Sequence, residues 1–178
     1  MSVRAFLASL AVLAVIGLLG FGLLSKGGAT IAIGDPAPDR ELPVLGGEGE
    51  GSIAEYRGRW VLVNLWASWC APCRQEAPEL ERFSQRYREH EVTVLGIDVQ
   101  DNSDDALAFV REYRLTYPQL RSVGDERSVA FGSTGVPENF LVDPRGRLAL
   151  IWRGPVDERF LRERVVPIIE GRQLEEAA

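Results

Sequence analysis

The stretch WVLVNLWASWCAPCRQEAP, residues 60–78, decides the fold. Its first eight residues are apolar apart from Asn64, which is typical of a buried strand. After the second cysteine, apolar side chains recur at intervals of three and four, which predicts a helix over residues 70–90. These apolar positions are Ala77, Leu80, Phe83 and Tyr87. A buried strand therefore leads directly into a helix, with two cysteines at the junction.

The residues on either side of this unit extend the pattern. Residues 34–52 contain three prolines and repeated Gly-Glu pairs, which predicts extended segments and turns. A second apolar strand is predicted over residues 92–99. It is followed by a predicted helix over residues 104–113, which Ser103 or Asp104 can cap.

The last third of the chain predicts a hairpin and a final helix. Two apolar runs, 140–142 and 148–152, flank the turn sequence Asp-Pro-Arg-Gly at 143–146. A helix is expected over residues 156–170, with a bend at Pro167. The order of strands and helices predicts an α/β domain with a central mixed sheet flanked by helices.

An apolar run of twenty residues without charge occupies residues 5–24. Since a helix of that length spans the roughly 30 Å hydrocarbon core of a bilayer, we predict a membrane anchor in residues 1–26. A linker at 27–33 and one domain at 34–178 would follow, with the amino terminus in the cytoplasm and the domain outside. The alternative is a cleaved signal peptide, with Gly-Gly-Ala at 27–29 as the cleavage site.

The charge balance argues against nucleic-acid binding. The chain has 20 basic and 26 acidic residues, a formal net charge of −6. Residues 1–26 contain Arg4 and Lys26 and no acid, so the remainder carries 18 basic and 26 acidic residues, a net charge of −8. An acidic domain of this kind lacks the basic patch that nucleic-acid binding requires.

The only cysteines in the sequence, Cys70 and Cys73, are placed for redox chemistry. A helix amino terminus offers unpaired backbone N–H groups and partial positive charge, which lower the pKa of a thiol there. We therefore expect Cys70 to be the attacking thiolate and Cys73 to resolve the mixed disulfide. Pro72 suits the first helical turn, where its missing N–H costs nothing.

Two other interpretations of this cysteine pair are a metal site and a structural disulfide. A zinc site normally needs four ligands, and the sequence adds only His90 to the two cysteines, so we expect no metal. A purely structural disulfide suits an exported protein, but a loop of two residues restrains the unfolded chain little. His90 ends a charged helix and is expected to be a solvated residue.

The segment at 60–78 resembles the active-site segment of the thioredoxin superfamily, and the resemblance extends over most of residues 34–172. Within that superfamily the chain is most similar to the extracytoplasmic TlpA/ResA group, especially the cytochrome c biogenesis thiol-disulfide oxidoreductases known as CcmG or DsbE. The opening at 34–43 also resembles peroxiredoxins, but WCxxC stands where their TxxC motif would be expected.

A second signature of this branch lies at residues 135–140, Gly-Val-Pro-Glu-Asn-Phe, where the branch has Gly-x-Pro-Glu-Thr-Phe. The resemblance implies that the Val136–Pro137 bond is cis and faces the cysteines, and that the Val136 backbone pairs with an extended substrate. A trans turn proline is the alternative. We expect a substrate groove beside Trp69 and this loop, with acidic groups such as Glu138 favouring a cationic peptide.

A third signature is Glu76, three residues after Cys73. The resemblance implies that this acid tunes the cysteine pair and moves protons, because a carboxylate near sulfur raises thiol pKa values and can act as a general base. The alternative is a surface residue that interacts favourably with the helix amino terminus. Thioredoxins carry a buried Asp where this chain has Asn64, and an amide cannot act as a base. Proton transfer would therefore fall to Glu76, with Glu138 or Asp98 as the expected helpers.

The resemblance implies a membrane-anchored thiol-disulfide reductase that needs no cofactor. Its expected substrate is the disulfide of the apocytochrome c haem-binding motif, and its expected electron donor is a membrane thiol oxidoreductase. Two alternatives stay open. One is a general periplasmic disulfide reductase or oxidase, and the other is a non-catalytic chaperone that holds apocytochrome or haem.

Overall fold

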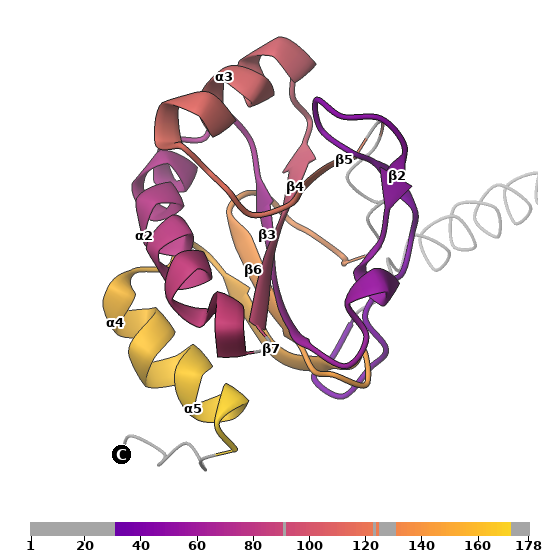
Figure 1. Ribbon diagram of the computed structural model, residues 1–178, viewed down its shortest axis with the longest axis vertical. Coiled ribbons are helices and arrows are strands. Elements are labelled where there is room, and N and C mark those ends of the chain that lie inside the picture. The colour runs from indigo at the N-terminus through magenta and orange to yellow at the C-terminus, as the bar shows by residue number, and fades with distance from the viewer. Residues whose placement is uncertain (1–30, 91, 123, 125–130, 172–178) are drawn as a thin grey trace, which may run out of the picture. The chain divides into compact units, whose positions relative to one another are not determined.

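The computed structural model describes residues 31–90, 92–122, 124 and 131–171, and it is built around one five-stranded sheet (Figure 1). The strand order is β5-β4-β3-β6-β7. Strands β3, β4 and β5 run parallel, and β6 and β7 are antiparallel to their neighbours, so the predicted mixed sheet is confirmed. The strands are β3 (Trp60–Trp66), β4 (Val92–Val99), β5 (Gln119–Ser122), β6 (Glu138–Val142) and β7 (Leu148–Arg153).

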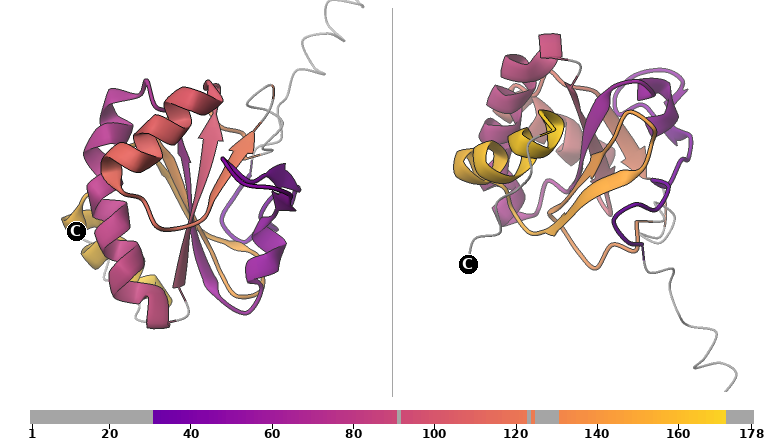
Figure 2. Two further views of the ribbon diagram at one scale, coloured as in Figure 1. Left: turned by 45° about the horizontal axis from the view of Figure 1, so that its top comes forward. Right: turned by 90° about the horizontal axis from the view of Figure 1, so that it is seen from below.

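The helices cover one face of this sheet (Figure 2). Helix α2 is continued by a short 3-10 turn, η2, and the carboxyl-terminal helix consists of α4, the π-helical turn η4 and α5. The bounds are α2 (Ala71–Tyr87), η2 (Arg88–His90), α3 (Ser103–Tyr113), α4 (Glu158–Phe160), η4 (Leu161–Val165) and α5 (Val166–Ile169). The predicted helix at 70–90 and the strand before it are therefore confirmed, as is the exposed position of His90.

The two faces of β3 bury alternate side chains. Leu62 and Trp66 pack under the helices, and Trp66 stacks on Phe109 of α3 with ring centroids 4.5 Å apart. Val61 and Val63 face the other side, where the amino-terminal segment covers the sheet. This alternation places the one polar residue of the strand, Asn64, on the helix side, directly beneath α2.

The amino-terminal segment that covers the second face contains more structure than the sequence predicts. It forms a two-stranded hairpin of β1 (Leu42–Pro43) and β2 (Glu50–Gly51), followed by a 3-10 turn, η1 (Ile53–Tyr56). Leu42 and Ile53 contribute to the core on this face. The prolines permit only such short elements. The prediction of extended segments and turns is therefore confirmed, and the structure adds the pairing of β1 with β2.

Two local expectations need correction. Helix α3 is capped neither by Ser103 nor by Asp104, because Asn102 Oδ1 accepts the backbone N–H of Asp104 at 2.9 Å. The final helix begins at Glu158, with Asp157 as its cap, two residues after its predicted start. In this helix the π-helical turn η4 lies shortly before Pro167, where a bend was predicted.

Gly96 on β4 gives a test of the packing beneath the sheet. Trp66 Nε1 donates to Gln119 Oε1 at 3.0 Å across this glycine, and a Cβ there would clash with both atoms. Gly96→Ala is therefore expected to lower the free energy of unfolding by about 1–3 kcal/mol, measured by chemical denaturation. Gly135→Ala is the matched control, since a Cβ there meets open space, and it should change stability by less than about 0.5 kcal/mol. Equal losses in the two variants would contradict this account.

The predicted anchor at 5–24 and most of the linker at 27–33 lie outside the described residues. Among the helices that are described, none combines the length and the apolar character needed to cross a membrane.

Candidate active site

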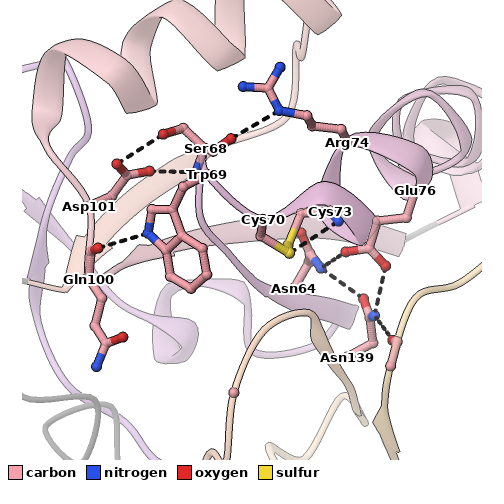
Figure 3. Close-up of a disulfide and its surroundings, with 12 residues drawn as sticks. Asn64, Ser68, Trp69, Cys70, Cys73, Arg74, Glu76, Gln100, Asp101 and Asn139 are labelled. Carbon is pink, nitrogen blue, oxygen red and sulfur yellow. Dashed lines mark hydrogen bonds between the residues drawn. A yellow bond between two sulfur atoms is a disulfide. The ribbon is translucent and has the colours of Figure 1, made fainter.

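The cysteine pair lies at the junction of β3 and α2 (Figure 3). Cys70 is the cap residue of α2, and its Sγ accepts the backbone N–H of Cys73 at 3.2 Å. The two cysteines form a disulfide and are buried, with 3% and 1% of their surfaces exposed. Pro72 lies in the first helical turn, as predicted. The sulfur of Cys70 therefore sits where the helix amino terminus stabilises a thiolate most effectively.

The turn before the disulfide is held by the loop that follows β4. The side chain of Asp101 accepts the backbone N–H of Ser68 and, at 3.0 Å, its hydroxyl. Trp69 Nε1 donates to the carbonyl of Gln100 at 3.0 Å, while 59% of the Trp69 surface remains exposed. Asp101 was not predicted from the sequence as part of the site. Its place just beyond a strand parallel to β3 was the available signal, because carboxyl ends of parallel strands meet at one sheet edge.

Asp98 belongs to a cluster of charged side chains with Asp101 and Arg121, which is separate from the cysteine pair. It is buried at the end of β4, with Arg121 Nε 3.4 Å from one carboxylate oxygen. Burial, followed by the nearby charge of Asp101, raises the pKa of Asp98 from 3.8 to about 7, against the opposing effect of Arg121. Asp98 thus lies close to Asp101, the residue that holds Ser68. Among the described residues, no hydrogen bond joins Asp98 to Glu76.

Glu76 points into the protein from the first turns of α2 and is 1% exposed, so the alternative of a surface residue is wrong. Its Oε1 accepts from Asn64 Nδ2 at 2.7 Å, and its Oε2 accepts from Asn139 Nδ2 at 3.2 Å and from the backbone N–H of Val156 at 3.0 Å. Burial raises the pKa of Glu76 from 4.5 to about 7, although these three donors lower it. A carboxyl group with this pKa can accept and release a proton near neutral pH.

The proline loop faces the cysteine pair. The Val136–Pro137 bond is cis, as predicted, so the alternative of a trans turn proline is wrong. An open groove of about 300 Å³ separates this loop from Pro72, and residues 153–155 complete its wall. The loop therefore lies across this groove from Pro72, which lies between the two cysteines in sequence, and Val136 packs against the cluster that contains Cys70 and Cys73.

Glu138 is buried at this loop and bonds to other groups of the protein. It is 2% exposed, and its Oε1 accepts from the backbone N–H and the hydroxyl of Thr134, at 3.0 and 2.9 Å. The same oxygen accepts from Arg153 at 2.6 Å. The carboxylate thus fixes the loop and is paired with Arg153, whereas the sequence predicted an acidic group that favours a cationic peptide.

Asn139 completes the site and was not singled out in the sequence. Its amide lies between Asn64 and Glu76, and it is completely buried (Figure 3). The available signal was the departure from the Thr of the branch that residues 135–140 resemble.

The profile of the AhpC/TSA family matches residues 33–151, which include the active-site segment and the opening at 34–43. Thiol:disulfide interchange protein HelX of Rhodobacter capsulatus is 35% identical over 80% of this chain and 80% of its own length. Protein DsbE of Allochromatium vinosum is 36% identical over 78% of this chain and 76% of its own length. ResA of Geobacillus thermodenitrificans, a thiol-disulfide oxidoreductase, is 29% identical over 78% and 79%.

Solved structures give the same result. A structure from Chlorobium tepidum, described as a thiol:disulfide interchange protein DsbE, superposes with a TM-score of 0.72. It is 25% identical, and the match covers 79% of this chain and 99% of that one. The chain belongs to the AhpC/TSA family and is a thioredoxin-like thiol:disulfide oxidoreductase of the DsbE and ResA type, with Cys70 and Cys73 as its cysteine pair.

Proposed function

We propose that the protein is a membrane-anchored, extracytoplasmic reductase of the disulfide in the apocytochrome c haem-binding motif. The observation that carries the proposal is the groove between Pro72, which stands between the two cysteines, and the cis Val136–Pro137 loop, because this loop lies in the signature at 135–140 that resembles the cytochrome c branch. Relatives named HelX and DsbE support the same branch.

In the first chemical step, the Cys70 thiolate attacks one sulfur of the substrate disulfide. A Cys70–substrate bond forms, the substrate S–S bond breaks, and the other substrate sulfur leaves as a thiolate. The helix amino terminus favours this step because it stabilises the thiolate of Cys70, the residue at the cap of α2.

In the second step, Cys73 resolves the mixed disulfide. Glu76 takes the proton of the Cys73 thiol, and the resulting thiolate attacks Cys70 Sγ. The Cys70–Cys73 disulfide forms, the remaining substrate sulfur leaves as a thiolate, and two electrons have passed to the substrate. Glu76 then returns the proton to solvent, and a membrane thiol oxidoreductase reduces the disulfide again.

The substrate is held as an extended peptide along the groove. The backbone of Val136 pairs with the peptide next to its reacting cysteine, in a short form of strand addition. The exposed indole of Trp69 offers an apolar contact surface on the same side of the disulfide. Glu138 contributes by fixing the loop, since its carboxylate is buried against Arg153.

The proposed location depends on residues 5–24, which would anchor the chain in the cytoplasmic membrane with the domain in the periplasm or outside the cell. A phosphatase fused after residue 178 tests this. Activity of the fusion outside the cytoplasm is expected, and activity confined to the cytoplasm would contradict the proposed orientation.

A trapping experiment tests the substrate. Cys73→Ala removes the resolving thiol, so the variant should accumulate a Cys70-linked mixed disulfide with apocytochrome c in cells. The double variant Cys70→Ser, Cys73→Ala is the matched control and should capture nothing. Capture of many unrelated proteins without cytochrome precursors would point to a general oxidoreductase.

Two further measurements separate the alternatives. A reduction potential near that of strong oxidants, about −120 mV, would contradict a reductant. A non-catalytic chaperone would be indicated if Cys70→Ser left cytochrome c maturation unimpaired, whereas the proposed reductase predicts a defect that an added external thiol relieves.

A further inference from the structure

The carboxylate of Glu76 is surrounded by hydrogen-bond donors from three different segments. Asn64 Nδ2 comes from β3, Asn139 Nδ2 from β6 and the N–H of Val156 from the segment that follows β7. Donors of this kind stabilise the charged form of a carboxyl group, whereas its burial favours the neutral form. The proton affinity of Glu76 therefore depends on the balance of two opposing effects, and each donor shifts that balance.

Asn139 is the donor that the rest of the structure orients most strongly. Its Oδ1 accepts from Asn64 Nδ2 at 3.1 Å, and its Nδ2 donates both to Glu76 and to the carbonyl of Gly154, at 3.1 Å. A turn of the amide by 180° would set Nδ2 against Asn64 Nδ2 and Oδ1 against two acceptors. The amide is therefore locked with its donor side toward Glu76.

Protonation of Glu76 adds an O–H donor at a place where all three neighbouring groups are themselves hydrogen-bond donors. A neutral carboxyl group needs an acceptor for its O–H, and the three hydrogen-bond partners of Glu76 all present N–H groups to it. Either Asn64 or Asn139 must rearrange, or the O–H stays without a good partner. The locked amide of Asn139 resists such a rearrangement, because turning it also breaks the bond to Gly154.

We propose that Asn139 is a positioning residue that sets how readily Glu76 accepts the proton of Cys73, and thereby sets the pH range in which the mixed disulfide is resolved. This inference rests on the proposed role of Glu76 as the base. It adds a determinant that the signature at 135–140 does not supply, because a Thr at this position has a single O–H donor and cannot serve both Glu76 and Gly154 in the way an amide does.

Other ionisable groups near Glu76 must be separated from its titration. Tyr117 interacts electrostatically with Glu76, but burial raises its pKa, so it stays neutral over the relevant pH range. The cysteines of the pair titrate themselves when reduced. Asp98, in its own group with Asp101 and Arg121, also has a pKa of about 7. A pH profile alone therefore does not assign a shift to Glu76, and a background without this carboxyl group is needed.

The test follows the resolving step with Ellman's reagent, an aromatic disulfide. Cys70 of the reduced full-length protein releases the first aromatic thiolate; Cys73 then attacks Cys70 Sγ and releases the second. The rate of the second release is measured by absorbance between pH 5 and 9. Asn139→Leu removes the amide at similar volume, so it should shift the midpoint of this profile upward by about one pH unit. Asn139→Thr keeps one hydroxyl and should shift it less, in the same direction.

The double variant with Glu76→Gln decides the assignment. In a Glu76→Gln background, Asn139→Leu is expected to leave the remaining profile unchanged. An equal shift in that background, or none in either folded Asn139 variant of the Glu76 protein, would overturn the proposal. If Asn139→Leu fails to fold, Asn139→Thr carries the same comparison. Failure of the proposed base itself would show differently, as a second release that Glu76→Gln does not slow.

Discussion

Cys70→Ser should lower the rate of disulfide reduction by roughly three orders of magnitude or more. A serine hydroxyl is not ionised near neutral pH, and its oxygen cannot form the mixed disulfide through which the electrons pass. The substitution is nearly isosteric at a buried helix cap, and serine is itself a favourable cap residue, so the fold should persist. The measurement is the rate at which the reduced protein reduces a disulfide peptide containing Cys-x-x-Cys-His.

Cys73→Ser provides the control for this prediction. It should retain the attack by Cys70 and stop at the mixed disulfide, so one equivalent of peptide becomes attached to each protein molecule. Circular dichroism should show both variants folded. Rapid attachment of peptide to the Cys70→Ser variant through Cys73 would show that the order of the two cysteines is wrong.

The second large effect is a pH-dependent stability that depends on Glu76. Burial raises the pKa of this carboxyl group from 4.5 to about 7, so the folded protein keeps a proton that the unfolded chain has released. Its contribution to stability is present below about pH 4.5 and is lost as the pH rises through about 7. The loss amounts to about 3 kcal/mol in the free energy of unfolding of the oxidised protein. Glu76→Gln should remove this part of the pH dependence.

Denaturant unfolding at pH 4.5 and pH 8 measures the effect as a difference, which cancels any constant cost of the substitution. Asp98 contributes in the same direction, because burial and Asp101 raise its pKa from 3.8 to about 7. The difference in unfolding free energy between pH 4.5 and pH 8 should therefore be smaller in Glu76→Gln than in the unmodified protein. It should decrease further when Asp98→Asn is added. An unchanged difference in Glu76→Gln would show that this carboxyl group is ionised over the whole range.

The sequence was sufficient for the parts of the molecule that have strong local patterns. The run of apolar residues at 60–67 and the helical spacing after Cys73 predict the strand and helix that carry the disulfide. Strand β5 was missed, because Gln119 and Ser122 are polar yet buried, and their burial depends on contacts with distant residues such as Trp66. Periodicity does not report such contacts.

The candidate site, like the fold, could be predicted from the sequence only in part. The cysteines and the cis proline could be predicted, because each belongs to a motif readable within a few residues. Glu76 was also predicted, but its contacts with Asn64 and Asn139 could not be, because the three residues come from separate elements and meet only through the sheet register and the packing of α2. The prediction that Glu138 favours a cationic peptide had the same weakness, because the sequence does not show that Arg153 pairs with it across β6 and β7.

The burial of the disulfide next to an exposed indole has a consequence for kinetics. With 3% of Cys70 and 1% of Cys73 exposed, the disulfide presents little surface to small thiols, whereas Trp69 is 59% exposed. Exchange is then fast only for a partner large enough to settle over the indole and the loop that faces the cysteines. Reduction of this disulfide would accordingly follow the abundance of its protein partners and depend little on the low-molecular-weight thiols around it.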